Sequence, residues 1–436
     1  MRQPGLKQLY QHFLESTGIC TDTRQQVEGS IFFALRGENF DGNRFVEDAL
    51  NNGCRVAVTE RKELAGAARV LVVADALKTL QDLASYHRME RSPKVIAITG
   101  SNGKTTTKEL VNAVLGTSFQ VLATRGNLNN HIGVPLTLLT LQKEQIAIVE
   151  MGANHPGEIA ELARIAAPDL GIITNVGKAH LEGFGSLEGV LHAKGELYEY
   201  LAGHGGKAMI DGGDRMLLDK AASTGVSSLV VGAVGNLPVS VNIISQTPFL
   251  EIGLEVSGRI YKRSTHLVGA YNLQNILLAA GVGIHFGIDP DSIVEAIGDY
   301  VPQNQRSQLV KGERNHLILD SYNANPSSMR EAINGLMHFA TPPTLLILGD
   351  MAELGDTSEQ EHRELVEWIG MLGVDRVLLV GPNFSQVCEP SDQFVVFRGR
   401  DELETYLNRE KPAGYHILVK GSRVMELERL KPLLLS

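Results

Sequence analysis

The sequence predicts an α/β fold in three domains, with parallel sheets in the second and third. Its 436 residues correspond to about three domains of ordinary size, and 43% hydrophobic with 21% charged residues is the balance of a globular chain with a large core. From Lys94 onward, short apolar runs alternate with stretches of helical length, which is typical of parallel sheets covered by helices. Between residues 237 and 268 the pattern changes to alternating, β-rich segments.

Residues 1–84 predict a small N-terminal α/β unit. Strand-like runs occur at residues 30–35, 55–59 and 69–73, and one helical stretch lies near residues 45–52. We expect this unit to form a domain of its own, with a boundary near residue 84.

Residues 85–312 predict a central domain built on a parallel sheet. Its apolar runs end at Thr99, Glu150 and Thr174, and helical stretches separate them. Because ligands bind at the carboxyl ends of parallel strands, functional groups are expected just after these positions. The β-rich residues 237–268 are expected to add an antiparallel edge to this sheet, followed by a helix near residues 271–286.

Residues 313–436 predict a third, Rossmann-like domain. Apolar runs ending at Asp320, Leu348, Val380 and Val419 again alternate with helices, which is the pattern of a doubly wound unit. The loops after these strands are therefore further candidates for ligand binding.

Composition and charge narrow the class of protein. The net charge of −10 argues against nucleic-acid binding, so anionic ligands are expected to be held locally by basic side chains, helix termini and metal ions. No apolar stretch approaches the roughly 20 residues of a membrane span and the N-terminus lacks a signal-peptide core, so a cytoplasmic protein without membrane insertion is expected. The three widely spaced cysteines support neither a disulfide framework nor a zinc site.

A glycine-rich segment after the first apolar run of the central domain is the most specific motif. Residues 99–107 read Thr-Gly-Ser-Asn-Gly-Lys-Thr-Thr-Thr, between a predicted strand and a predicted helix. In such a P-loop, backbone N–H groups and the helix N-terminus bind phosphates, Lys104 adds a positive charge and the Thr105 hydroxyl binds Mg²⁺. The common motif has glycine where this chain has Ile98, so this is a variant P-loop. We therefore expect a central P-loop ATPase domain that uses ATP and Mg²⁺.

Two strand ends near the P-loop carry further candidate groups. Glu150 ends an apolar run, where a buried carboxylate needs a metal ion or a partner, and a solvated strand-end acid explains it equally well. His180 follows the next strand and Lys194 lies fourteen residues further on. Taken alone, a single histidine is more often structural, and a lysine in this setting more often belongs to a solvated helix face.

Other segments suit substrate binding, although each also has a simpler structural explanation. The amide-rich residues 126–133 suit the binding of a sugar or a phosphate, and a turn explains them equally well. The amide-rich residues 269–275 suit the binding of an adenine, and helix capping explains part of this pattern. Arg306 suits the binding of a phosphate and Asp320 the binding of a ribose, although either residue could equally form a surface ion pair. Loops at the ends of strands in the third domain lie at residues 320–329, 348–355 and 420–423.

Together these segments resemble the ATP-dependent Mur ligases over nearly the whole chain. The strings Ser-Tyr-Asn-Ala-Asn-Pro after Asp320 and Leu-Gly-Asp-Met-Ala-Glu-Leu-Gly at residues 348–355 are most similar to those of members that add D-alanyl-D-alanine to UDP-N-acetylmuramoyl-tripeptide. The resemblance implies a monomeric ligase of peptidoglycan precursor synthesis with these two small-molecule substrates. Such an enzyme converts a carboxylate to an acyl phosphate with ATP before an amine attacks.

The resemblance also assigns roles around the ATP. The residues that would bind its phosphates are Thr99, Gly100, Ser101, Asn102, Gly103, Lys104, Thr105 and Thr106. Arg306 would contact the γ-phosphate, Asn272 the adenine and Asp320 the ribose. Two Mg²⁺ ions are implied, one on Thr105 and Glu150 and one on His180 and Lys194, with the lysine as its carbamate because an ammonium repels a metal. The implied catalytic residues are Lys104, His180, Lys194 and Arg306.

For the substrates, the resemblance implies one set of residues in each half of the chain. The UDP substrate would contact Asp22, Thr23, Arg24, Arg36, Gly37, Asn39, Phe40, Asn127 and Asn130. The dipeptide side would comprise Asn323, Asn325, Ser328 and Arg423. A histidine frequently follows the Asp-Gly pair at residues 41–42 in this family, whereas this chain has Asn43. With ATP contacts divided between two domains, closure of the C-terminal domain would exclude water from the acyl phosphate.

Four other functions can be compared with the sequence. A UDP-MurNAc-tripeptide synthetase usually carries Asp-Asn-Pro-Arg in its last domain, which this chain lacks, and folylpolyglutamate synthetase normally lacks a unit like residues 1–84. A P-loop kinase or ATPase switch would form no amide, and Ile98 and the appended α/β domain argue against it. A nonenzymatic binding module would leave the P-loop and the acidic, histidine and lysine candidates without a common role.

Overall fold

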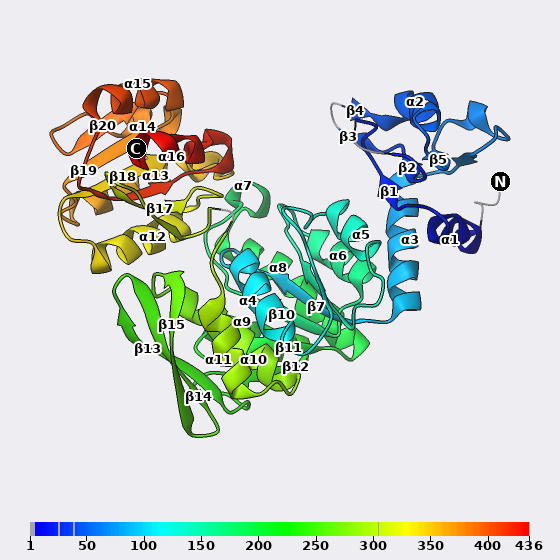
Figure 1. The fold of residues 1–436 in the computed structure, drawn as a ribbon, viewed down its shortest axis with the longest axis horizontal. Helices are drawn as coiled ribbons and strands as arrows, with labels where there is room; N and C mark the ends of the chain where they lie inside the picture. Colours follow the sequence, from blue (N-terminus) through cyan, green and yellow to red (C-terminus); the bar gives the residue numbers. More distant parts are fainter. Residues whose placement is uncertain (1–4, 25–26, 38–39, 304, 436) are drawn as a thin grey trace.

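The computed structural model of the chain describes residues 5–24, 27–37, 40–303 and 305–435 (Figure 1). The N-terminal and C-terminal units lie at opposite upper corners of the view, and the central unit lies below and between them. The α/β fold with parallel sheets in three units is the one expected from the sequence.

The N-terminal unit is a small parallel sheet with helices. Its strand order is β1 (Ile19–Cys20), β2 (Ile31–Phe33), β5 (Val56–Thr59) and β6 (Val70–Val72). A short hairpin of β3 (Arg36–Gly37) and β4 (Phe40–Asp41) precedes α2 (Val46–Asn51), and α1 (Leu6–Leu14) begins the unit.

Helix α3 (Ala76–Arg91) joins the N-terminal unit to the central one (Figure 1). Its Leu80, Leu83 and Ala84 are fully buried in a core that includes residues of both units. The expected boundary near residue 84 lies inside this helix, so that boundary stays a prediction.

The central sheet is parallel throughout and buried on both faces. Its strand order is β12 (Ser227–Val231), β11 (Lys207–Asp211), β10 (Leu170–Ile173), β7 (Lys94–Thr99), β9 (Ile146–Glu150) and β8 (Val121–Ala123). Successive side chains of a strand point to opposite faces, and along β7 Val95 and Ala97 belong to one apolar cluster whereas Ile96 and Ile98 belong to another. Burial on both faces explains why these strands read as continuous apolar runs.

Helices cover each face of the central sheet. The first face is covered by α3 together with α5 (Gly133–Leu138), α6 (Glu158–Ala166), α8 (Leu187–His204) and α9 (Arg215–Thr224). The second is covered by α4 (Lys104–Leu115), α10 (Asn272–His285) and α11 (Pro290–Asp299). A short helix, α7 (Leu181–Phe184), follows β10 and lies beside the C-terminal unit (Figure 1).

The expectation that residues 237–268 add an antiparallel edge to the central sheet is wrong, because their strands form a separate antiparallel sheet. Strands β13 (Val239–Gln246), β14 (Phe249–Val256) and β15 (Arg259–Val268) pair only with one another among the described residues. The free edge of β12 is covered instead by the Asn236 side chain, which accepts from Val230 N at 2.7 Å and donates to Ser228 O at 2.9 Å. These bonds occupy backbone groups that another strand would need.

The C-terminal unit is a second doubly wound sheet. Its order is β16 (Gln308–Lys311), β17 (His316–Asp320), β21 (His416–Lys420), β18 (Thr344–Gly349), β19 (Arg376–Val380) and β20 (Phe394–Phe397), with only β16 antiparallel among these strands. The flanking helices are α12 (Pro326–Phe339), α13 (Ser358–Gly370), α14 (Pro382–Val387), α15 (Arg400–Glu410) and α16 (Lys431–Leu435). The expected boundary near residue 313 lies between β16 and β17 and stays a prediction.

Two expectations about the whole chain can be compared with the structure. The three cysteines are all buried and free, as the absence of a disulfide framework requires. Within the described ranges, we find no helix with the length and apolarity of a membrane span.

Candidate active site

The P-loop joins β7 to α4 as the sequence predicts, and its shape depends on two glycines. Gly100 and Gly103 have φ values of +142° and +76°. A Cβ on Gly100 would lie 1.9 Å from Thr174 Oγ1, and one on Gly103 would lie 2.4 Å from Asn275 Oδ1. Ile98, at the position where the common motif has glycine, is fully buried and pairs with Glu150 of β9. The sheet therefore continues through Ile98, and the loop begins only at Gly100.

Lys104 begins α4 and folds back over the loop. Its Nζ donates to Gly100 O at 2.7 Å and to Ser101 O at 3.3 Å. Burial, together with the positive charge of Arg306, lowers the pKa of Lys104 to about 8, although Glu150 acts in the opposite direction. Lys104 is thus a desolvated cation at the positive end of a helix, which suits a phosphate.

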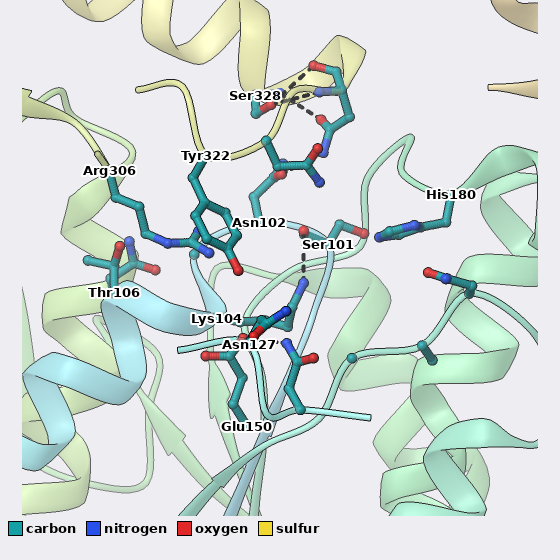
Figure 2. Close-up of a pocket in the computed structure, with 18 of the residues that line it drawn as sticks. Ser101, Asn102, Lys104, Thr106, Asn127, Glu150, His180, Arg306, Tyr322 and Ser328 are labelled. Carbon is teal, nitrogen blue, oxygen red and sulfur yellow. Dashed lines mark hydrogen bonds between the residues drawn. The ribbon is translucent and has the colours of Figure 1, made fainter. Parts of the chain in front are cut away.

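Glu150 ends β9 beneath the P-loop and is only 2% exposed (Figure 2). Its Oε2 accepts from Thr105 Oγ1 at 2.9 Å and its Oε1 accepts from Asn129 Nδ2 at 2.9 Å. The buried Lys108 ammonium lies 4.0 Å from Oε2. A buried carboxylate beside a hydroxyl is the oxygen donor set that Mg²⁺ prefers, so Thr105 and Glu150 fit a magnesium ion. This arrangement favours a partnered carboxylate over the solvated acid that the sequence left open.

A cavity of about 390 Å³ opens over the P-loop between the central and C-terminal units (Figure 2). The candidate residues that line it are Ser101, Asn102, Gly103, Lys104, Thr106, Asn127, Asn130, Glu150, His180, Asn272, Arg306, Asp320, Asn323, Asn325 and Ser328. Thr99, Gly100 and Thr105 lie in the strand, loop and helix beneath it. The structure therefore gathers side chains that are more than 200 residues apart in the chain.

The C-terminal unit contacts the P-loop directly through Asn325. Its Nδ2 donates to Asn102 Oδ1 at 2.8 Å. Asn325 also forms a capping box at the start of α12, because its Oδ1 accepts from Ser328 N at 2.9 Å while Ser328 Oγ accepts from Asn325 N at 3.1 Å. Asn325 and Ser328 thus hold α12 against the cavity as well as lining it.

Arg306 and Asp320 enter the cavity from the side of β17. The guanidinium of Arg306 lies 3.8 Å from the centre of the Tyr322 ring, and its buried Nε has no hydrogen-bond partner among the described residues. Asp320 Oδ2 lies 2.5 Å from Lys420 Nζ, and its Oδ1 accepts from Ser307 N at 3.0 Å. An unpartnered cationic donor beside the P-loop suits an anionic ligand.

Arg423 is less closely connected to the cavity than the other dipeptide-side candidates. It is exposed, and it does not line the cavity in the described residues. Its guanidinium lies 5.3 Å from the Tyr322 ring centre, with Nη1 3.5 Å from the Tyr322 hydroxyl. Arg423 therefore reaches the site only through Tyr322.

His180 and Lys194 lie near one another, but only His180 lines the cavity. The Phe184 ring centre is 6.3 Å from that of His180 and 5.5 Å from Lys194 Nζ. Lys194 is 1% exposed, and within the described parts of the chain no carboxylate pairs with it. Burial and the charge of Lys104 lower the pKa of Lys194 to about 7. The interpretation that Lys194 belongs to a solvated helix face is therefore wrong.

Asn272 lines the cavity, but its amide is used within the protein. Its Nδ2 donates to Val268 O at 2.9 Å, and its Oδ1 accepts from Asn275 Nδ2 at 2.9 Å. A second cavity of about 720 Å³ lies beside the P-loop and is lined by Gly103, Gln274 and Asn275 among others. Space for a base is therefore present next to α10.

The candidates in the N-terminal unit stay apart from this cavity. Arg24 pairs with Asp22 on the surface at 2.7 Å and holds the pKa of Asp22 at about 2. Arg36 and Gly37 form one strand of the β3–β4 hairpin, and Phe40 of the other strand stacks on Phe45 at 5.4 Å. Thr23 lies in the loop after β1, and Asn39 lies outside the described residues.

Asn43, where the family frequently has histidine, has a structural role. It is 3% exposed and its amide donates to Asp41 Oδ1 at 2.8 Å. Its Oδ1 accepts from Thr59 Oγ1 at 2.7 Å and from Glu60 N at 3.0 Å. With these bonds, the Asn43 side chain ties the hairpin to β5.

Several residues that line the cavity or contact its candidate residues were not singled out from the sequence, and four of them serve as examples. These residues are Asn129, which bonds Glu150, Tyr322, which stacks on Arg306, Glu353, which pairs with His180, and Lys420, which pairs with Asp320. Each lies within a segment that the sequence marks as a ligand-binding loop. The segment was therefore recognisable, but the partner of each side chain depends on contacts between distant residues.

The comparisons with known proteins agree with this geometry over the full length of the chain. Residues 15–88 match the Mur ligase family catalytic domain, residues 98–283 the Mur ligase middle domain and residues 305–423 the Mur ligase glutamate ligase domain. The chain is 35% identical over 428 residues to the UDP-N-acetylmuramoyl-tripeptide--D-alanyl-D-alanine ligase of Bacillus subtilis, covering 95% of this chain and 92% of that protein.

Solved structures give the same result. MurF from Acinetobacter baumannii has a TM-score of 0.89 at 33% identity, covering 99% of this chain and 98% of that one. MurF ligase from Thermotoga maritima in complex with ADP has a TM-score of 0.86 at 26% identity, covering 97% of each chain. Likeness of this extent in sequence and in structure shows that the chain belongs to the Mur ligase family.

Proposed function

We propose that this protein is an ATP-dependent ligase that joins D-alanyl-D-alanine to UDP-N-acetylmuramoyl-tripeptide, forming the UDP-linked pentapeptide precursor of peptidoglycan. The observation that carries the proposal is 35% identity over 95% of the chain to the Bacillus subtilis ligase of that name. The cavity between P-loop and C-terminal unit supplies the chemistry such a ligase needs. A cytoplasmic location and a monomeric state stay predictions.

The proposed reaction has two steps, and in each step one bond forms as another breaks. A terminal carboxylate oxygen of the tripeptide attacks the γ-phosphorus of ATP, and ADP leaves with the electrons of the broken P–O bond. The amine of the dipeptide then attacks the acyl carbon, phosphate leaves and the amine loses a proton. In this proposal Lys104 and the N–H groups of the P-loop hold the phosphates, and Arg306 stabilises negative charge on the phosphoryl group; their positions around the cavity support these roles.

Two Mg²⁺ ions belong to the proposal, and each has a candidate set of ligands. Thr105 and Glu150 form the first set, in which the oxygen donors already lie together. His180 and Lys194 form the second, with the lysine as a carbamate; the amine of Lys194 is desolvated and has no carboxylate paired to it in the described part of the chain, which fits this modification. When bound, the metal would neutralise phosphate charge.

The nucleoside and the two other substrates are assigned to neighbouring surfaces. We assign the base to the second cavity, which Gln274 lines, since the polar groups of Asn272 and of Asn275 are already bonded within the protein. Asp320 is assigned to the ribose and Asn323, Asn325 and Ser328 to the dipeptide side. The UDP group is assigned to the N-terminal unit, and Asn127 and Asn130 to the substrate end that reaches the cavity.

Phosphate release from Mg-ATP tests the proposed function. We expect release by the purified protein only when UDP-N-acetylmuramoyl-tripeptide and D-alanyl-D-alanine are both present, because the acyl phosphate is shielded from water until the amine attacks. A colorimetric phosphate assay with each substrate alone and with both measures this dependence. Release without either substrate would indicate a P-loop ATPase switch, and no release under any combination would contradict the assignment.

Nucleotide binding is expected to take up a proton above pH 8. Because the pKa of Lys104 is about 8 in the free protein, most of its amine is neutral at pH 9, and a bound phosphate favours the charged form. The Kd for ADP should therefore rise about tenfold from pH 7 to pH 9. Calorimetry in two buffers of different ionisation enthalpy counts the protons. Lys104→Arg, with its permanent charge, should abolish the uptake, and equal heats in both buffers for the unmodified protein at pH 9 would exclude this role for Lys104.

A further inference from the structure

The loop after β18 carries a carboxylate from the C-terminal unit onto His180 of the central unit. Glu353 Oε2 lies 2.5 Å from Nδ1 of the His180 ring, a close ion-pair contact, although Nδ1 has no hydrogen-bond partner of regular geometry among the described residues. Since β18 and β10 belong to different sheets, this contact exists only while the two units are together. It is one of a small set of polar contacts across the cleft, beside the bond between Asn325 and Asn102.

The backbone around the pair is arranged to bring the two side chains together. Glu182 N donates to Glu353 O at 3.2 Å, which joins α7 directly to the loop after β18. Gly355 packs against the same residue, because a Cβ placed on it would lie 3.2 Å from Glu182 Cα. Contact between the two units is therefore continuous along this segment and does not depend on one side chain.

Both members of the pair occupy unusual backbone conformations. His180 has φ +52° and Glu353 has φ +61°, in the left-handed region that residues with side chains seldom adopt. The His180 carbonyl accepts from the N–H groups of Gly183 and Phe184, each at 3.1 Å, and so begins α7. Such conformations persist where surrounding contacts impose them, and they concentrate at functional sites.

The contact determines which nitrogen of the ring is available to the cavity. A carboxylate on Nδ1 favours the form in which Nδ1 carries the hydrogen and Nε2 keeps its lone pair. Figure 2 shows the His180 ring extending into the pocket toward Ser101, and the edge of the ring packs against Phe184 with an interplanar angle of 87°. The nitrogen left free by Glu353 is thus the one that a cation in the cavity would meet.

We infer that Glu353 is a positioning residue that orients the His180 imidazole for a divalent cation when the C-terminal unit closes over the P-loop. The inference rests on the proposed function, since the cation is the second metal of the ligation reaction. It adds a link between closure and metal binding, because a side chain from the other unit orients one ligand of that metal. Metal-binding histidines are commonly held in this way by a carboxylate on their other nitrogen.

Manganese binding tests this role without relying on turnover. The full-length protein with ADP and UDP-N-acetylmuramoyl-tripeptide is titrated with Mn²⁺, and free Mn²⁺ is read by electron paramagnetic resonance. We expect two bound Mn²⁺ ions in the unmodified protein. Glu353→Ala should raise the Kd of the weaker site about 10- to 100-fold and leave the tighter site, on Thr105 and Glu150, unchanged. Glu353→Gln, whose amide oxygen can still accept from Nδ1, should restore part of the affinity.

Two further variants control for indirect effects. Glu359→Ala removes an exposed carboxylate of α13 that pairs with Arg363 and should leave both Mn²⁺ sites unchanged. His180→Ala should lose the same site as Glu353→Ala, and adding Glu353→Ala to it should change nothing more. Because the Glu353 side chain is 45% exposed, its removal is not expected to unfold the protein, and a melting curve checks this.

Three results would overturn the inference. They are an unchanged Mn²⁺ isotherm in Glu353→Ala, an equal loss at both sites, or a single site in the unmodified protein. Each is distinguishable from failure of the proposed function, because phosphate release by the unmodified protein with both substrates is measured separately.

Discussion

Replacing Lys194 with alanine is expected to lower the rate of amide formation by on the order of 10² to 10³, and short carboxylic acids such as acetate are expected to restore part of that rate. Lys194 is buried without a carboxylate partner within the described residues, and its pKa is lowered to about 7. Much of the amine is therefore unprotonated at neutral pH, which is the form that adds CO₂ to give a carbamate. In the alanine variant, the space left by the side chain can admit a free carboxylate to the same position.

Phosphate release with both substrates, measured over a range of acetate and formate concentrations, gives the result. Lys220→Ala is the matched control, because Lys220 of α9 packs beside Gly195, the residue that follows Lys194 on α8, and pairs with Glu199 at 2.7 Å. That variant should keep its rate and should not respond to acetate. A folded Lys194→Ala protein that no carboxylic acid restores would weaken the carbamate assignment.

Gly100→Ala is expected to destabilise the P-loop and to abolish measurable nucleotide binding. Gly100 has φ +142°, and a methyl group on it would lie 1.9 Å from Thr174 Oγ1. That hydroxyl cannot move freely, because it donates to Asn102 O at 2.6 Å and so holds the loop. Backbone strain and overpacking together should lower the free energy of unfolding by about 2–6 kcal/mol. Urea unfolding and calorimetric ADP titration measure the two effects.

Gly203→Ala serves as the control for this substitution. Gly203 lies near the end of α8, and a Cβ there would meet no atom within 4 Å. It should therefore raise the free energy of unfolding by roughly 0.4–1 kcal/mol through the lower entropy of the unfolded chain. If Gly100→Ala were as stable as the parent and bound ADP equally well, the close contact with Thr174 would not constrain the loop.

Local patterns predicted the elements whose burial is complete. The strands ending at Thr99, Glu150 and Asp320 were predicted because apolar residues cover both faces of a parallel sheet and make long unbroken runs. Strand β8, with three half-buried residues at the sheet edge, has no such run. The P-loop was predicted because its glycines and its lysine lie close together within one short segment of the sequence.

Side-chain hydrogen bonds account for what the patterns could not predict. The β-rich residues after β12 were expected at the edge of the central sheet, but the Asn236 side chain occupies that edge. The contact of Asn272 with adenine stays a prediction, and the structure adds that Val268 and Asn275 bond its amide. In each case a hydrogen-bond partner several residues or more away decides whether a polar group is free, and no periodicity records that partner.

The sequence by itself determined the class of the protein: an α/β fold, a variant P-loop at residues 99–107 and the order of the motifs that resemble Mur ligases. These depend on residue type and spacing along one strand, loop or helix. Only the tertiary structure decided that Lys194 is buried behind Phe184, that Asn325 reaches the P-loop and that Glu353 meets His180. The physical reason is that burial and pairing are properties of surfaces brought together by folding, whereas a linear sequence specifies only neighbours along the chain.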